Sequence, residues 1–517
     1  SLLTTSLSRA ASLSDAAYDA VIVISHCASA IAGTAATQPL SAAVEKYLQL
    51  NKSAANSAHV IPVDESILPS GRLIYSGTGP VSRDYDDVRR FGYAARDAMK
   101  LALSAGVHSP LLVTLPHSRY PQAELVAALG ALQSAHVPLN VREAEPNRQT
   151  LKQLGLLPVS SDGGKRLLEL VAALDQAFTV TRDVGDQGPE RMAPPRVSEY
   201  VQGAFAGSDS VRVSVIEDQA EIKREFPLIS AVNRGCDQVP RHHARYIRLE
   251  YVGEGPTEQT IYLVGKGVTL DTGGIDLKIG GSMFGMCRDK YGAAVVAGFF
   301  KVLEQLKPKG IKVVGQMSAV RNSIGAEAYS TDEVLTSRSG KRIHIYNTDA
   351  EGRLILLDQL TKAREEAVDA VNPHVLTVAT LTGHEVIAYG YYASMLDNGP
   401  ARASGLSKRI QDAGDEYGQP VEITRLHHED FVFHAADCKQ ADLRQGNTRP
   451  STQTMRGHMG PAAFLTMGSR LDEHGTDSNK PIPFTHIDMG AAQGEHPDTS
   501  YPNPLVALVA AMILPRV

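Results

Sequence analysis

Cysteine is scarce in this chain of 517 residues, and no two cysteines lie close together. Cys27, Cys236, Cys287 and Cys438 are widely separated and form no C-x-x-C motif. Disulfide-stabilised small domains and thiolate zinc sites need several cysteines at short intervals. The cysteine content therefore argues against both.

Long apolar runs are also absent, since the most apolar segment, residues 505–514, is too short to cross a bilayer and predicts a buried helix. Acidic and basic residues are interspersed, and the formal net charge of -6 gives no electrostatic footprint for nucleic acid or membrane. Residues 1–14 lack the apolar core of a secretory signal. We expect a cytoplasmic protein that binds neither nucleic acid nor membrane.

Three common catalytic motifs are missing, because the sequence has no G-x-S-x-G, no G-K-[ST] and no H-E-x-x-H. Histidines do cluster at His242-His243, at His427-His428 and at His434. Adjacent histidines do not share a face of a strand or a helix, so structural roles are favoured over a histidine metal site.

The segment 347–353, Asn-Thr-Asp-Ala-Glu-Gly-Arg, is the most informative motif that is present. If it is extended, Asp349, Glu351 and Arg353 share one face. The alternating residues before it predict a strand of an open α/β sheet, and the apolar run after it predicts a helix. Two carboxylates held together repel each other unless a cation or a shared proton intervenes. A divalent metal would serve, although an acidic helix cap is the alternative for this motif alone.

A second cluster of charges follows an apolar strand at residues 262–264. It contains Lys266, Asp271, Lys278 and Asp289, with glycines that let the backbone approach a ligand closely. Lysines beside aspartates can be solvated loop charges. Because acidic and basic groups recur in both clusters, we expect one shared, buried site.

At these residues the chain resembles the leucine aminopeptidase family, two-zinc exopeptidases with a hexameric α/β architecture. The resemblance runs from about Arg182 to the C-terminus and rests on segments 264–267, 271–274, 277–278, 347–353, 380–383 and 485–488. It implies an aminopeptidase that hydrolyses the first peptide bond of peptides through a metal-bridging hydroxide. The released residues would be apolar and leucine-like, and the assembly a homohexamer.

The resemblance also implies two divalent metal ions per chain, with Zn²⁺ expected and Mn²⁺, Mg²⁺ or Co²⁺ possible at an exchangeable site. One ion would be held by Lys266, Asp271, Asp289 and Glu351, and the other by Asp271, Asp349 and Glu351. Carboxylate oxygens suit these ions, and two ions about 3.5–4 Å apart can act together on one substrate. A lysine ligand must be neutral, so we expect burial beside two cations to lower its pKa.

The same resemblance implies roles for further residues. Lys278 would stabilise the developing oxyanion, and Arg353 would hold a bicarbonate ion that transfers the proton to the leaving amine. Met286, Thr380 and Gly383 would contact the substrate. Next to Asp289 the chain departs from the family pattern, with Lys290-Tyr291 in place of small or apolar residues.

Short apolar strands at residues 20–24, 59–63 and 111–115 alternate with helical patterns at 85–103 and 122–134. This order predicts an α/β fold with two domains, each a mixed or mostly parallel sheet flanked by helices. A helical stretch at 164–178 and a break in pattern at 182–189 separate them. We expect an N-terminal α/β domain at 1–165, a linker helix at 166–181 and a catalytic domain at 182–517.

Two other classes of function stay open. A non-catalytic relative would keep the fold as a structural or binding protein, but it would show lost ligands, and none of the expected ligands is missing. A dual protein would bind nucleic acid or another partner through its N-terminal domain. Such a domain would carry a basic stripe, and residues 1–180 show none.

Overall fold

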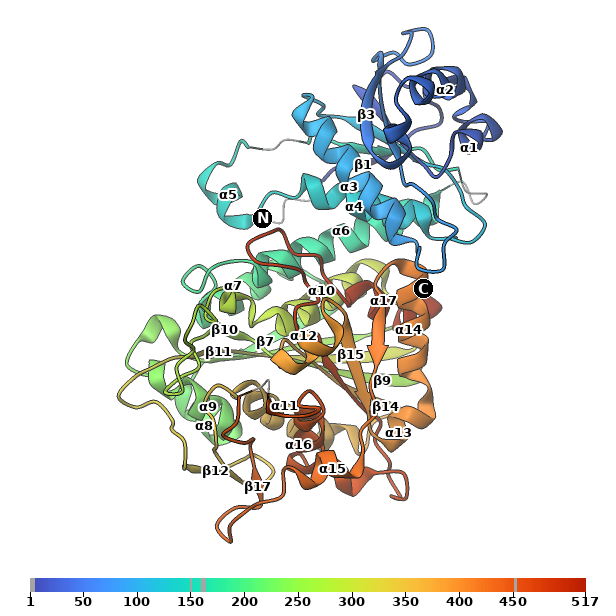
Figure 1. The fold of residues 1–517 in the computed structure, drawn as a ribbon. Helices are drawn as coiled ribbons and strands as arrows, with labels where there is room; N and C mark the ends of the chain where they lie inside the picture. Colours follow the sequence, from blue (N-terminus) through green and yellow to red (C-terminus); the bar gives the residue numbers. More distant parts are fainter. Residues whose placement is uncertain (1–4, 149–150, 160–163, 451–452) are drawn as a thin grey trace. The chain divides into compact units, whose positions relative to one another are not determined.

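The computed structural model describes residues 5–148, 151–159, 164–450 and 453–517, and it divides the chain into two compact units (Figure 1). The first unit holds the described residues up to Thr179 together with Asp412–Gln419, and the second holds Val180–Gln411 and Pro420–Val517. Each unit contains a largely parallel sheet and several helices, so the predicted α/β class is confirmed. No helix in the described part of the chain is both long enough and apolar enough to cross a membrane.

The first unit is built on a six-stranded sheet with the order β1-β6-β5-β2-β4-β3, in which only β3 runs antiparallel to its neighbour. Every residue of strand β2 is buried, as expected for a parallel strand covered on both faces. The strands are β1 (Leu7–Arg9), β2 (Ala20–Ser25), β3 (Ala58–Pro62), β4 (Arg72–Gly77), β5 (Pro110–Thr114) and β6 (Leu154–Leu156). The helices are α1 (Ala28–Gly33), α2 (Ser41–Leu50), α3 (Arg89–Ser104), α4 (Ala123–Ala135) and α5 (Leu139–Ala144).

The three strands predicted in this unit correspond to β2, β3 and β5, and the helix predicted at 122–134 corresponds to α4. The helix predicted from residue 85 begins only at Arg89. A turn precedes it, in which the Asp86 carboxylate accepts hydrogen bonds from the backbone and side chain of Arg83. Local side-chain bonds of this kind compete with helix formation.

The second unit is built on a nine-stranded sheet with the order β16-β15-β18-β14-β9-β11-β8-β7, and β10 pairs with β11 beside this path. The strands are β7 (Val211–Ile216), β8 (Arg245–Val252), β9 (Gln259–Gly265), β10 (Val268–Asp271), β11 (Ile311–Asn322), β14 (Pro373–Ala379), β15 (Ala393–Asp397), β16 (Val421–Ile423) and β18 (Phe484–Asp488). The helices are α7 (Pro194–Ala204), α8 (Gln219–Glu225), α9 (Pro227–Asn233), α10 (Tyr291–Leu306), α11 (Gly352–Ala367), α12 (Gly383–Tyr389), α13 (Gly399–Ser404), α15 (His428–Val432), α16 (Gly460–Gly468) and α17 (Leu505–Met512). The predicted C-terminal helix corresponds to α17.

Helices α10 and α11 cover opposite faces of the central strand β9. Tyr262 and Val264 belong to the hydrophobic cluster that includes the apolar side of α11. Gly265 points the other way, and a Cβ there would lie 2.7 Å from the Cα of Ala293 in α10. Alternation of side chains along a strand explains the two faces. A glycine is needed at 265 because backbone approaches backbone there.

Five neighbouring strands of this sheet run parallel to one another, namely β10, β11, β9, β14 and β18. Their carboxyl ends therefore meet at one edge. Asp271, Asn322 and Asp488 are the last residues of β10, β11 and β18, and Lys266 and Thr380 directly follow β9 and β14. Polar residues gathered at this edge are typical of ligand sites in open α/β sheets.

Two expectations about connecting segments are wrong. The helix α6 runs from Lys165 to Gly185 and passes through Arg182, where a break was expected. It continues because Val180 and Val184 extend the buried apolar face one more turn. The domain ranges expected from the sequence stay a prediction.

The other correction concerns the strand before the 347–353 motif. This strand, β13 (Arg342–His344), does not lie in the large sheet. It forms a separate three-stranded sheet with β12 (Val334–Thr336) and β17 (Leu443–Arg444). Only its central residue is buried, so its alternating pattern could not tell which sheet it joins.

Candidate active site

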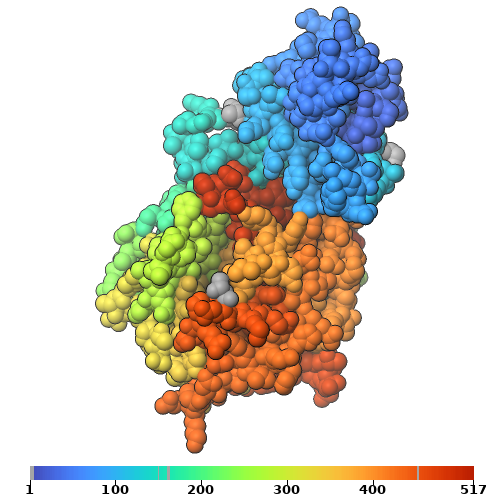
Figure 2. Space-filling view, viewed as in Figure 1, coloured from blue at the N-terminus to red at the C-terminus, as the bar shows by residue number. Residues whose placement is uncertain are grey.

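A cavity of about 1290 Å³ opens at the carboxyl edge of the second unit's sheet. Its lining comes from segments far apart in the sequence, and Figure 2 shows yellow-green and orange segments together on one face of this unit. All ten residues expected at the site line it: Lys266, Asp271, Lys278, Met286, Asp289, Asp349, Glu351, Arg353, Thr380 and Gly383. The structure thus brings the expected residues together, while the role of each stays a prediction.

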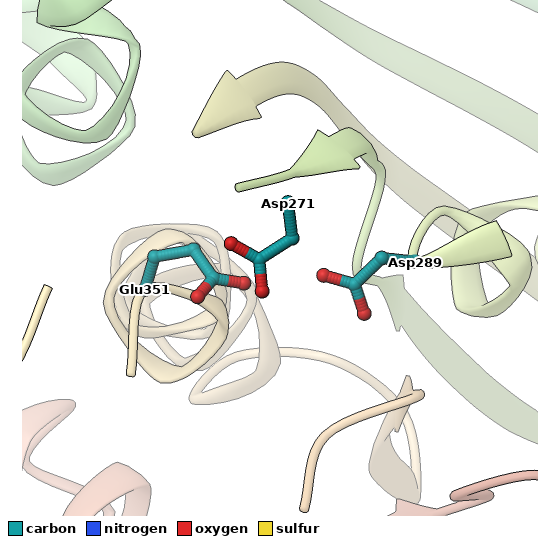
Figure 3. Close-up of side chains that lie close together, drawn as sticks. All are labelled: Asp271, Asp289 and Glu351. Atoms are coloured by element: carbon teal, nitrogen blue, oxygen red, sulfur yellow. The ribbon is translucent and has the colours of Figure 1, made fainter. Parts of the chain in front are cut away.

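Three buried carboxylates converge in this cavity, and Figure 3 shows them directed toward one another. Asp271 ends β10, Asp289 follows the short 3₁₀ helix η5 (Met286–Arg288), and Glu351 precedes α11. One oxygen from each lies within 4.8 Å of the others. In the part of the chain that the structure describes, this is the cluster able to hold a metal ion, and it contains no histidine.

Two lysines lie against these carboxylates. The Lys266 Nζ is 2.8 Å from Asp289 Oδ1 and 3.1 Å from Glu351 Oε1. The Lys278 Nζ is 2.7 Å from Asp349 Oδ1 and 3.3 Å from Asp271 Oδ2. Each lysine therefore bridges two carboxylates, one from each of the two sequence clusters.

Burial makes the negative charges at the site costly. Desolvation, followed by the charges of Asp271 and Glu351, raises the pKa of Asp349 to about 8. Desolvation and Asp271 also raise the pKa of Glu351. Burial raises the pKa of Asp289 well above its usual range, although the charge of Lys266 acts in the opposite direction. Carboxyl groups in such a place favour either protons or added positive charge.

Burial and three neighbouring carboxylates act in opposite directions on Lys266. Burial alone would lower its pKa, but the carboxylates of Asp289, Glu351 and Asp271 outweigh this effect and raise it. The protein's own charges therefore favour a protonated Lys266. Bound cations would act in the opposite direction and favour the neutral amine that a ligand needs.

The 347–353 motif is not extended, so the predicted alternation of its side chains is wrong. Its start is a turn in which Asn347 Oδ1 accepts a hydrogen bond of 2.7 Å from the Asp349 backbone N–H. Glu351 has helical angles, φ -77 and ψ -32, and α11 begins at Gly352. Asparagine side chains commonly form such turns by bonding the backbone two residues on. The carboxylates still reach one site because the turn and the first helical turn project into the same cavity.

Asn322 is a residue of the site that sequence reasoning missed. Its Nδ2 donates to Asp271 Oδ1 at 2.8 Å and to the Thr348 carbonyl at 3.0 Å, and it is fully buried. It thereby fixes one carboxylate relative to the 347–353 motif. The available signal was a lone asparagine at the end of a long apolar strand.

Thr380 and Asp488 hold the loop that borders the carboxylate cluster. The Thr380 Oγ1 donates to Asp289 Oδ1 at 2.9 Å, and its carbonyl accepts from Lys266 Nζ at 2.8 Å. Asp488 accepts from Thr382 Oγ1 at 2.7 Å and from the Leu381 N–H at 3.2 Å. The loop is therefore tied to the cluster on one side and to β18 on the other.

Arg353 lies in the first turn of α11 and is half-buried. Its Nη1 donates to the Gln445 carbonyl at 3.0 Å. Desolvation lowers its pKa to about 10, so it remains charged at neutral pH. Its Nε has no hydrogen-bond partner among the described residues. A buried donor without a partner is costly, and an anion in the cavity would satisfy it.

The carboxylate cluster fits a divalent metal in its chemistry. Asp289 Oδ2 is buried and has no hydrogen-bond partner among the described residues, although Oδ1 of the same group has two. Hard oxygen donors in a compact, buried group are the ligands that Zn²⁺, Mn²⁺ and Mg²⁺ accept. The donor set is therefore suited to a metal centre.

Comparison with known proteins agrees with this chemistry. Residues 179–508 match the catalytic domain of the cytosol aminopeptidase family. A putative aminopeptidase of Caenorhabditis elegans is 63% identical over 521 residues, covering 100% of this chain and 99% of the relative. A probable cytosol aminopeptidase of Paraburkholderia xenovorans is 30% identical over 456 residues, covering 85% of this chain and 82% of the relative.

Solved structures share the fold at low sequence identity. The apo structure of a leucyl aminopeptidase from Trypanosoma cruzi has a TM-score of 0.81 at 19% identity, covering 98% of this chain and 96% of that one. The bottromycin maturation enzyme BotP, solved in complex with Mn, has a TM-score of 0.76 at 21% identity, covering 96% of this chain and 99% of that one.

The fold and the site thus define an α/β metalloexopeptidase. The chain belongs to the cytosol aminopeptidase family. The family resemblance inferred from the sequence is confirmed.

Proposed function

We propose that this protein is a two-metal aminopeptidase that hydrolyses the N-terminal peptide bond of peptides and releases apolar, leucine-like residues. The observation that carries the proposal is the group of three buried carboxylates with oxygens within 4.8 Å of one another, at the edge of a cavity large enough for a peptide end. Lys266, Asp271, Asp289 and Glu351 would hold one ion, and Asp349 would join Asp271 and Glu351 at the second. Zn²⁺ is our expectation, with Mn²⁺, Mg²⁺ or Co²⁺ at an exchangeable site.

When bound, two divalent ions would polarise the scissile carbonyl and lower the pKa of an attacking water molecule. Side chains of the protein would supply the other interactions that catalysis needs. Lys278 is half-buried at the cavity wall, and its Nζ lies 2.7 Å from Asp349 Oδ1. A charged donor held beside the reacting carbonyl would stabilise the oxyanion that forms there. Its contact with two carboxylates keeps it protonated and in position.

Arg353 would bind an anion such as bicarbonate through its buried Nε, which has no hydrogen-bond partner in the described part of the chain, and this anion would carry a proton to the leaving amine. Met286 and Thr380 would form the walls for the first side chain of the substrate, and Gly383, which also lines the cavity, would contact the substrate beside them. A thioether wall favours apolar side chains of different shapes. We propose that the working form is a homohexamer in the cytoplasm, as the family resemblance implies.

The test is hydrolysis of a panel of aminoacyl amides and their N-acetylated counterparts by the metal-replete protein, with released amino acids identified. We expect leucine and methionine amides to be cleaved and every N-acetylated substrate to resist cleavage. A preference for acetylated substrates would refute exopeptidase action at the N-terminus.

A matched pair of variants links activity to the cluster. Glu351→Gln removes one charge from the carboxylate cluster with little change in shape, and it should abolish activity. Glu429→Gln makes the same change at an exposed glutamate that also lines the cavity, and it should not. Equal effects of the two variants would remove the cluster from the mechanism.

A further inference from the structure

The turn that carries Asp289 is held by a buried lysine directly next to it. Lys290 is 1% exposed. Its Nζ donates to the Gln187 carbonyl at 2.8 Å and also to the Cys287 carbonyl. Among the described residues no carboxylate forms an ion pair with it, so backbone carbonyls stabilise its charge.

The two hydrogen bonds of Lys290 hold the backbone of the turn that carries Asp289. Cys287 and Lys290 lie on either side of Asp289, so the bond from Lys290 to the Cys287 carbonyl closes a ring that contains the backbone of Asp289. The bond to Gln187 then anchors the ring to the segment that follows α6. A buried ammonium with two fixed carbonyl acceptors leaves the backbone of the turn little freedom.

Arg288, within this ring, and Tyr291, directly after it, are fixed as well. The Arg288 Nε lies 3.2 Å from Asp186 Oδ1, and its Nη1 donates to the Glu495 carbonyl at 3.1 Å. The Tyr291 hydroxyl donates to Ser500 Oγ at 2.8 Å. Lys290 is therefore the central contact of a scaffold whose enclosed residue is a proposed metal ligand.

We propose that Lys290 is a positioning residue, which sets the affinity of the metal centre by fixing the backbone that carries Asp289. The inference rests on the proposed metal centre. Groups outside the ligand set that orient a ligand commonly change metal affinity by about 10-fold to 100-fold when removed. Here the orienting group acts through the main chain, because Lys290 makes no bond to the Asp289 carboxylate.

Lys301 offers a matched control in α10, the helix that begins directly after Lys290. It is also buried, at 4% exposed, and its Nζ donates to the Ala204 carbonyl at 2.8 Å. It pairs with Glu304 and lies 12 positions beyond Asp289 in the sequence. Lys301→Met therefore removes a buried ammonium without disturbing the turn at Asp289.

The experiment is calorimetric titration of the metal-depleted full-length protein with Mn²⁺, accompanied by thermal unfolding. We expect Lys290→Met to weaken at least one Mn²⁺ site by about 10-fold or more, and Lys301→Met to bind Mn²⁺ as the unmodified protein does. Should Lys290→Met fail to fold, Lys290→Gln replaces it, because its amide NH₂ can still donate hydrogen bonds but carries no charge, and it should also weaken Mn²⁺ binding. Unchanged binding in the folded Lys290 variant, or equal weakening in the Lys301 variant, would overturn the inference. A protein that binds no Mn²⁺ before any substitution would overturn the metal centre as well.

Discussion

Three enclosed histidines should make the second unit sensitive to mild acid. His374 is 2% exposed, and His434 and His486 are 0% exposed. Burial lowers the pKa of each to about 3, and the charge of Arg353 contributes at His434 and His486. All three are therefore neutral in the folded protein across the physiological range.

The sign and size of the effect follow from linkage. In the unfolded chain a histidine has a pKa of about 6.5. As the pH falls below this value the unfolded state binds protons that the folded state cannot accept, so the free energy of unfolding decreases. At pH 5.5 each histidine should cost about 1.4 kcal/mol relative to pH 7.5, and the three together about 4 kcal/mol.

The assay compares urea unfolding of the unmodified protein and of His374→Gln at pH 7.5 and 5.5. A comparison of variants is needed because other groups titrate in this range. Burial raises the pKa of Asp358 to about 7, for example, so protonation of this group stabilises the folded state as the pH falls. His374→Gln, which can still bond to Thr485 Oγ1, should lose about 1.4 kcal/mol less than the unmodified protein between the two pH values. Identical losses would refute the assignment of a neutral, buried His374.

Other predictions concern the site and the assembly. Lys278→Ala should lower kcat by roughly 10²–10³, the effect of losing one oxyanion donor, with little change in metal content, and an unchanged kcat would remove Lys278 from the mechanism. Lys266→Arg should fold normally but lose the ion held with Asp289, because arginine does not deprotonate; metal analysis that finds two ions and near-normal activity would contradict the ligand role. Sedimentation should show a hexamer, and a fully active monomer would contradict that assembly.

The site could be predicted from the sequence more completely than the fold around it. Lys266 and Asp271 both come soon after the apolar run at residues 262–264, and parallel strands bring such residues to one edge. The conformation of residues 347–353 was wrong because the Asn347 side chain makes a turn that periodicity does not report.

Contacts between residues far apart in the sequence were the second feature that could not be predicted. The membership of β13 in a small separate sheet depends on its pairing with Leu443, about a hundred residues away in the sequence. The contact between Lys290 and Gln187 likewise joins segments 103 residues apart. Local pattern carries no information about such pairs. Asn322 was missed for the same reason, since its role in the site depends on hydrogen bonds to Asp271 and Thr348, which only the fold brings near it.

The central claim is that buried carboxylates from two distant segments form one centre for two divalent ions. The most direct test is titration of metal-depleted protein with Mn²⁺ while bound metal and leucine amide hydrolysis are measured on the same samples. Full activity should require two ions per chain, and Asp289→Asn and Asp349→Asn should each remove one of them. Full activity with one ion or none per chain would contradict the account.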